Sequence, residues 1–244
     1  MINYIGITNK IKNEKHPNSD SLLLAGSIIR NEGTRYSDLD IVVIYKSLPK
    51  AYRESFIYNG ILVETFVHDP ETVDFFLNKF DKVNNSSTLA QMIVEGIEIP
   101  YSTPLSSAIK KKANDFILTG PNGLDEQTNN NMRYAITNLI DDIRDPKNKS
   151  ELFGTLSSLY TSLSEFYFKA NGYWAGSDKY VSRLMKKINS DLEKNFFDAF
   201  NTAIMNDNVD KVIKITEDIL RPFGGFLFDG YRFDATEEMR IQEN

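Results

Sequence analysis

The segment between residues 22 and 45 constrains the fold more than any other part of the chain. The apolar run Leu22–Ala25 ends at Gly26 and Ser27, ten residues follow, and Asp38 and Asp40 then open a second apolar run. Short apolar runs bounded by turn residues are typical of buried strands. Because strand side chains alternate, the two aspartates lie on one face while the apolar residues beside them point into the core. The pattern predicts a strand, a Gly-Ser turn that begins a short helix, and a second strand that carries two carboxylates.

The Gly-Ser pair has the features of a phosphate-binding turn. Glycine lets the backbone approach a phosphate closely, and the start of the expected short helix offers unpaired N–H donors to an anion. Ser27 adds a hydroxyl donor at the same place, and Arg30 lies one turn later. Arg30 is therefore a candidate phosphate ligand, with a surface salt bridge to Glu32 or Asp38 as the alternative.

The two aspartates favour a cation site. Carboxylates two residues apart on a strand are about 7 Å apart, and they repel each other unless a cation lies between them. Hard oxygen ligands of this kind suit Mg²⁺ that is bound together with nucleotide phosphates. The alternative is that Asp38 and Asp40 are surface residues of an edge strand that follows an ordinary turn. The joint pattern with Gly26 and Ser27 favours the cation site.

A hairpin is expected next along the chain. The runs Tyr52–Tyr58 and Ile61–Val67 flank Asn59 and Gly60. This dipeptide is the strongest short-range hairpin signal, because a type I′ turn needs positive φ at both central residues. The sequence therefore predicts two antiparallel strands joined by a two-residue turn.

Helices dominate the remainder of the chain. An Asp-Pro pair predicts a helix start at Pro70, because the aspartate can cap free N–H groups and proline suits the first helical position. From residue 104 onward the apolar spacing is helical throughout. The expected helices cover 70–80, 87–95, 105–118, 124–144, 149–170, 177–188, 190–206 and 208–220, followed by a packed irregular tail over 222–234.

The Gly-Ser turn and the Asp-x-Asp strand together resemble the signature of the nucleotidyltransferase superfamily, which includes DNA polymerase β and the aminoglycoside nucleotidyltransferases. Looser similarity to a bacterial group of two-domain members extends over Val63–Pro70, Leu89–Gly96, Arg133–Asp142 and Asn171–Arg183. The resemblance implies an α+β fold, with a mixed β-sheet flanked by helices over 1–100 and an all-α helical-bundle domain over 101–244. It also implies transfer of a nucleoside monophosphate from a nucleoside triphosphate to a hydroxyl, with release of pyrophosphate and two Mg²⁺ held by three carboxylates.

Carried over residue by residue, the resemblance makes Gly26 and Ser27 the cradle of the triphosphate and Asp38 and Asp40 catalytic metal ligands. One departure lies in the loop between them, where Asn31 stands at a position that is often glycine in relatives. Asparagine also tolerates left-handed backbone conformations, so the loop is expected to keep its shape.

The third carboxylate of such a site is expected on a neighbouring strand, where Glu64 is the only acidic residue of the run Ile61–Val67. An unpaired carboxylate in an apolar run is destabilising or becomes protonated. A metal ion resolves this problem, and Glu64 would also serve as the base toward the acceptor hydroxyl. The alternative is that Glu64 faces solvent or pairs with Arg53 across the hairpin. His68, on the same strand face, is either part of the acceptor site or a structural histidine.

Positive charge for the triphosphate is expected from the helical domain. Gly176, Ser177 and Asp178 can start a helix that places Lys179 in its first turn and Arg183 one turn later on the same face. We expect this pair to bind the nucleotide. The alternative is that both are ordinary surface residues.

Composition narrows the range of functions. Lys and Arg number 28 against 34 Asp and Glu, and the net charge of −6 argues against a nucleic-acid partner. The dense basic run Lys110–Lys112 is expected to be a solvated helix face. Cysteine is absent and histidine occurs twice, so thiolate chemistry is excluded and a histidine-rich zinc centre is disfavoured. No signal peptide or membrane-spanning apolar stretch is found, and a cytoplasmic protein without membrane contact is expected.

We therefore expect a Mg²⁺-dependent nucleotidyltransferase that transfers AMP from ATP to a hydroxyl of a small, antibiotic- or metabolite-like acceptor. The implied ligands are two Mg²⁺ ions, the nucleoside triphosphate and the acceptor, and a homodimer is compatible with the sequence. The alternatives are a protein-modifying or toxin–antitoxin-type adenylyltransferase and a non-catalytic nucleotide-binding module. Intact Asp38, Asp40 and Glu64 favour the enzyme, because a binding-only module would readily lose one of them.

Overall fold

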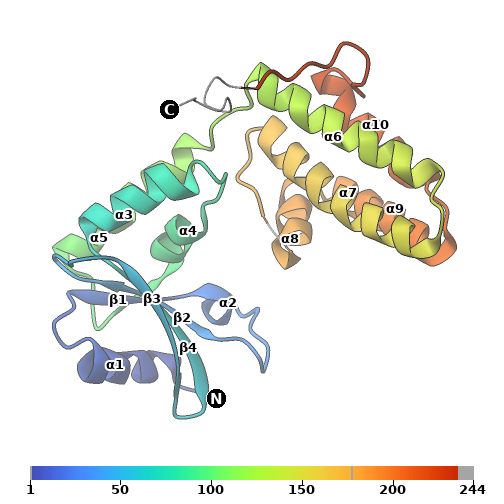
Figure 1. Ribbon diagram of the computed structural model, residues 1–244. Helices are drawn as coiled ribbons and strands as arrows, with labels where there is room; N and C mark the ends of the chain where they lie inside the picture. The colour runs from blue at the N-terminus through green and yellow to red at the C-terminus, as the bar shows by residue number, and fades with distance from the viewer. Residues whose placement is uncertain (1, 177, 236–244) are drawn as a thin grey trace, which may run out of the picture. The chain divides into compact units, whose positions relative to one another are not determined.

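The computed structural model describes residues 2–176 and 178–235 and divides into two compact units, Met1–Pro121 and Asn122–Asn244. A mixed β-sheet with flanking helices forms the first unit, and the second is built from helices (Figure 1). The α+β class expected from the sequence is confirmed. Among the described residues, no helix combines the length and the hydropathy that a membrane span requires.

Five strands form the sheet of the first unit, in the order β3-β4-β2-β1-β5. Their bounds are β1 Ser21–Ala25, β2 Leu39–Ile44, β3 Tyr52–Tyr58, β4 Ile61–His68 and β5 Ile97–Ile99. The central strands β2 and β4 run parallel, and the other three pairings are antiparallel. This arrangement places the two strands that carry predicted carboxylates directly beside each other.

The hairpin between β3 and β4 has the predicted turn. Asn59 and Gly60 both have positive φ, at 50° and 81°, as a type I′ turn requires. The turn sets the register of the two strands, in which Ser55 lies opposite Glu64 and Arg53 lies opposite Phe66. These four residues share one face of the hairpin because strand side chains alternate.

The sheet buries its two faces against different helices (Figure 1). On one face, α1 (Tyr4–Lys15) places the fully buried Ile11 among side chains of β1, β2 and β4. On the other face lie α3 (Pro70–Phe75), which continues into the π-helical turn η1 (Phe76–Asp81), and α4 (Thr88–Glu95). The predicted Asp-Pro helix start is present, with a capping box at the N-terminus of α3.

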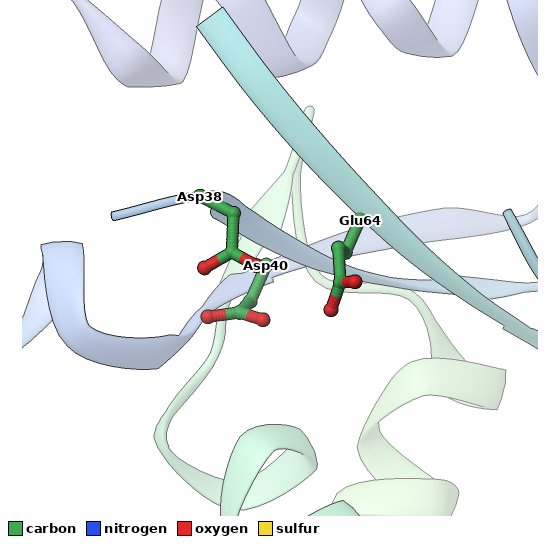
Figure 2. A group of neighbouring side chains, drawn as sticks. All are labelled: Asp38, Asp40 and Glu64. Atoms are coloured by element: carbon green, nitrogen blue, oxygen red, sulfur yellow. The ribbon is translucent and has the colours of Figure 1, made fainter. Parts of the chain in front are cut away.

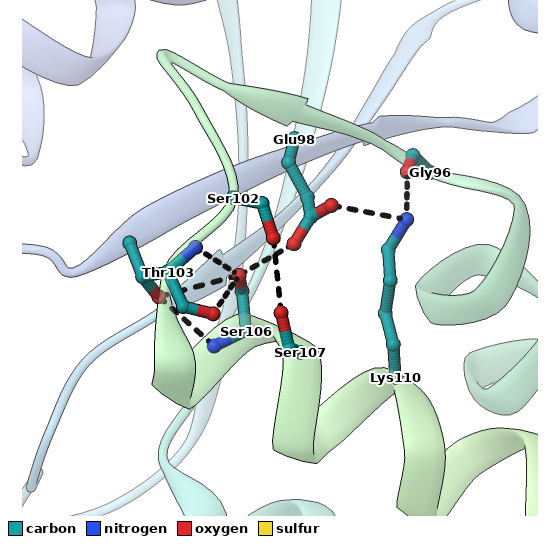
Figure 3. A network of polar contacts seen from close by, with 7 residues as sticks. All are labelled: Gly96, Glu98, Ser102, Thr103, Ser106, Ser107 and Lys110. Carbon is teal, nitrogen blue, oxygen red and sulfur yellow. Dashed lines mark hydrogen bonds and ion pairs between the residues drawn. The ribbon is translucent and has the colours of Figure 1, made fainter.

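A polar network attaches α5 (Pro104–Thr119) to the sheet of the first unit (Figure 3). Glu98 on β5 accepts a hydrogen bond from Ser106 and forms an ion pair with Lys110 at 3.6 Å. Lys110 also donates to the carbonyl oxygen of Gly96 at 2.6 Å. The first compact unit therefore extends through α5, beyond the boundary expected near residue 100, and Lys110 makes specific contacts in a run expected to be solvated.

Five helices with an apolar core form the second unit as far as it is described. They are α6 Glu126–Arg144, α7 Lys149–Ala170, α8 Lys179–Ile188, α9 Ser190–Asn206 and α10 Asp210–Leu220. Phe166 and Phe168 of α7 are among the largest fully buried side chains of this core. The predicted helix bounds agree to within two residues where they fall on described positions, and the expected start at Ser177 lies outside the described residues.

An irregular tail follows α10 and packs on α6, as the sequence predicts. Arg133 on α6 is buried and donates to the carbonyl oxygens of Gly224 and Gly225 at 2.6 and 2.7 Å. The ring of Tyr231 stacks on Tyr134 with 3.9 Å between ring centroids. These contacts fix the tail to the helical unit.

Candidate active site

Three carboxylates meet on one face of the sheet, over the central strands β2 and β4 (Figure 2). Asp38 immediately precedes β2, and Asp40 on β2 lies opposite Glu64 on the parallel strand β4. One oxygen from each of the three carboxylates lies within 4.8 Å of the others, and all three residues are half-buried. The fold thus brings the three predicted acidic residues into a single cluster.

Gly26 is packed tightly against this cluster. It follows β1, whose last residue Ala25 pairs with Asp40, and it begins the short helix α2 (Gly26–Ile29). Its φ is +77°, and a Cβ atom built on it would overlap the carboxylate of Asp40. Only glycine suits both conditions. Ser27, the next residue, is buried at the same turn.

The surroundings of Asp40 disfavour its ionised form. Burial, and then the charges of Asp38 and Glu64, raise the pKa of Asp40 from 3.8 to about 6. Arg30 and Arg53 oppose this shift with smaller effects. A cation between the three groups would relieve the repulsion, because opposite charge favours the ionised form.

Arg53 on the edge strand β3 contacts the third carboxylate. Its Nη2 lies 2.5 Å from both Oε1 and Oε2 of Glu64, and the Ser55 hydroxyl donates to Oε1 at 3.2 Å. The alternative arrangement considered for Glu64, an ion pair across the hairpin, is therefore present together with the acidic cluster. From the sequence, Arg53 is expected only as an alternative partner of Glu64 and not as a site residue. The signal for Arg53 is its diagonal position relative to Glu64 in the register of the hairpin.

Arg30 and the loop after it are held by local contacts. Arg30 forms an ion pair with Glu32 at 3.2 Å, as one interpretation expected, and a second with Glu95 at the end of α4. Asn31 adopts the left-handed conformation, with φ at 56°. The main-chain N–H of Glu32 donates to the carbonyl oxygen of Ser27 at 2.9 Å, which closes the turn after the Gly-Ser pair. A role of Arg30 toward phosphate stays a prediction.

Three further candidates lie in other surroundings. His68 is buried at the end of β4 with its ring edge-on to Phe76 at 5.0 Å between centroids, and a role in the acceptor site stays a prediction. Burial lowers the pKa of His68 to about 4. Lys179 and Arg183 lie on α8 in the second unit, with their charged groups 5.5 and 5.4 Å from the centroid of the Tyr180 ring. Their role toward a nucleotide stays a prediction.

Comparison with known proteins agrees with this geometry. Residues 7–96, which include most of α1, β1 to β4 and the acidic cluster, match the family model of the nucleotidyltransferase domain. Fold and site thus define a nucleotidyltransferase domain over residues 7–96 of the chain. The matched segment belongs to that domain family, and the chain that carries it is a transferase.

Similarity beyond this domain is low. A solved structure of a nucleotidyltransferase-like protein from Exiguobacterium sibiricum 255-15 is 13% identical, and the match covers 89% of this chain and 74% of that chain with a TM-score of 0.43. No curated protein matches the chain significantly.

Proposed function

We propose that this chain transfers a nucleoside monophosphate, AMP from ATP, to a hydroxyl of a small-molecule acceptor and releases pyrophosphate. The observation that carries the proposal is the convergence of Asp38, Asp40 and Glu64 within a nucleotidyltransferase domain. A net charge of −6 supports a small acceptor over a nucleic acid, because nucleic-acid binders depend on basic surfaces.

The cluster fits Mg²⁺ in its chemistry. All three groups offer hard carboxylate oxygens, which Mg²⁺ prefers, and they are close enough to share bound ions. Burial, and then the charges of Asp38 and Glu64, raise the pKa of Asp40, and a bound cation would favour its ionised form. When bound, Mg²⁺ supplies positive charge that neutralises the phosphates and stabilises the leaving pyrophosphate.

The chain's own residues supply position and proton transfer. The turn at Gly26 and Ser27 offers neutral hydrogen-bond donors to the triphosphate, and Asp38 and Asp40 hold the ions. The acceptor oxygen forms a bond to the α-phosphorus, the bond from that phosphorus to the β-phosphate oxygen breaks, and pyrophosphate leaves. Glu64, the third ligand, takes the proton of the acceptor hydroxyl. Arg30, Lys179 and Arg183 are the proposed cationic residues toward the phosphates.

The test is an assay of pyrophosphate release from each nucleoside triphosphate with Mg²⁺, across a panel of aminoglycosides, lincosamides and hydroxylated metabolites. We expect release with ATP that depends on one acceptor class and on Mg²⁺. Glu64→Gln should retain most nucleotide binding and lose transfer by orders of magnitude. Equal turnover by this variant and the unmodified protein would show that Glu64 is not the third carboxylate of the site. A modified polypeptide in place of a small product would favour the protein-modifying alternative.

A further inference from the structure

The third carboxylate of the cluster has two competing sources of positive charge. Glu64 contributes an oxygen to the acidic cluster, where a metal ion is proposed, and it also binds the guanidinium of Arg53. The contact is close at both oxygens, with Nη2 of Arg53 at 2.5 Å from each. The carboxylate of Glu64 points to the same side of the sheet as those of Asp38 and Asp40 (Figure 2).

Arg53 is placed so that it can leave this contact without disturbing the sheet. It lies on the edge strand β3, and its side chain is 60% exposed, whereas that of Glu64 is 19% exposed. Its guanidinium also lies over the ring of Phe66, 5.1 Å from the centroid. The aromatic face attracts a cation and would keep the released guanidinium beside the site.

Removal of Arg53 would not leave Glu64 without an orienting partner. The Ser55 hydroxyl, directly opposite in the strand register, donates to Oε1 of Glu64 at 3.2 Å. The distinct contribution of Arg53 is therefore its charge. A guanidinium and a divalent cation that share one carboxylate repel each other, so each weakens the binding of the other.

We propose that Arg53 is a built-in counter-ion of the third carboxylate, which the divalent cation has to displace, so that Arg53 weakens the binding of the metal alone. This inference rests on the proposed function, because it takes the acidic cluster to be a metal site. It makes Arg53 a positioning residue: in the metal-free protein it pairs with Glu64 and keeps that carboxylate in place, and it yields the carboxylate when the ion arrives.

The experiment is a Mn²⁺ titration of the full chain without nucleotide, followed by electron paramagnetic resonance, on the unmodified protein and on Arg53→Gln and Arg53→Lys. We expect Arg53→Gln to bind Mn²⁺ about three- to tenfold more tightly, in keeping with the strength of partly exposed ion pairs. Arg53→Lys, which keeps the charge and loses the planar fork, should lie in between. Should Arg53→Gln fail to fold, the lysine variant alone still has to bind more tightly than the unmodified protein.

Lys15→Gln is the matched control. Lys15 also pairs with an acid of β3, Glu54, at 4.0 Å and lies over an aromatic ring, that of Phe56, at 4.2 Å. Glu54 and Phe56 are on the opposite face of the hairpin from Glu64. This variant removes one positive charge of α1 that contacts the same hairpin, and it should leave Mn²⁺ affinity unchanged.

The outcomes separate this inference from the function on which it rests. Suppose that the unmodified protein binds Mn²⁺ and that Arg53→Gln binds it with equal or lower affinity. This result overturns the role of Arg53 and leaves the metal site intact. An equal gain in Lys15→Gln also overturns it, because the effect would then be general charge. No binding in any variant, or binding unaffected by Asp38→Asn with Asp40→Asn, overturns the metal site itself.

Discussion

Gly26 directly follows β1 and lies against the carboxylate of Asp40, and its lack of a side chain makes this close packing possible. The sequence suggested glycine here for access to phosphate. The structure adds a second reason, since a Cβ atom would overlap the carboxylate of Asp40 and the φ of +77° disfavours other residues. A single position therefore meets a conformational and a steric requirement at once.

Gly26→Ala should be more destabilising than a glycine substitution that meets the conformational requirement alone. We expect it to lower the free energy of unfolding by roughly 3 kcal/mol or more, from left-handed strain plus overlap with Asp40. Gly60→Ala is the control, because Gly60 has φ +81° with nothing within 4 Å of its built Cβ, and should cost about 1–2 kcal/mol. Chemical denaturation measures both, and equal losses would contradict the steric contribution.

His68 gives a pH dependence of stability. Its pKa is lowered by burial from 6.5 to about 4 in the folded protein, so between those values the unfolded chain binds more protons. Stability contributed by neutral His68 is therefore complete above about pH 6.5 and is lost as the pH falls toward 4. Denaturation at several pH values should show a steeper loss in the unmodified protein than in His68→Leu. If the free energy of unfolding depends on pH in the same way in both proteins, a group other than His68 is responsible.

At the scale of single elements, local chemistry predicted well wherever a residue type fixes the backbone. Asn59 and Gly60 gave the hairpin, and Asp69 with Pro70 gave the start of α3. Helix α1 and strand β5 have no comparable signal in the sequence and are not among the predicted elements. Only Thr8 and Ile11 of α1 are buried, so the apolar spacing of that helix is weak. Strand β5 has three residues, which is too short for a pattern, and it is defined by pairing with β1.

The attachment of α5 to the sheet can be tested at Lys110, which makes specific polar contacts in a run that the sequence predicts to be a solvated face. Lys110→Met should lower the free energy of unfolding by about 1–2 kcal/mol, because it removes the contacts to Gly96 and Glu98. Lys111→Met is the neighbouring control, since Lys111 is 78% exposed and its ion pair with Asp115 lies within α5. It should leave stability unchanged. Equal effects of the two variants would show that the network contributes nothing specific.

At the scale of the whole molecule, ligand binding and stability are linked. MgATP should raise the melting temperature, because a ligand bound only by the folded state stabilises it, by about 2.7 kcal/mol at a hundred times the dissociation constant. Asp38→Asn with Asp40→Asn should abolish that shift. The same variant should be at least as stable without ligand, because burial and then the charges of Asp38 and Glu64 disfavour the ionised form of Asp40, and asparagine carries no charge. If MgATP raises the melting temperature of the double variant as much as that of the unmodified protein, the two aspartates are not metal ligands.

The helical unit is predicted to contribute positive charge to nucleotide binding. Lys179→Ala should weaken ATP binding several-fold and leave the melting temperature of the ligand-free protein nearly unchanged, because Lys179 is exposed on α8. Calorimetric titration with MgATP and thermal denaturation provide the two measurements. Unchanged ATP affinity and turnover in this variant would show that other residues supply the positive charge for the nucleotide.

The pairing of β2 with β4 has a consequence for the specific activity of a preparation. Asp40 and Glu64 face each other because two parallel strands are hydrogen-bonded in one register. A slip of β4 by one residue would put Val63 or Thr65 opposite Asp40 and turn Glu64 toward α1, since side chains alternate. Spacing between the two carboxylates is thus set by main-chain hydrogen bonds, and a misregistered molecule would be inactive rather than slow. The specific activity of a preparation would then report the fraction of molecules in the native register, and loss of activity on ageing would follow loss of that fraction, with the turnover rate of the survivors unchanged.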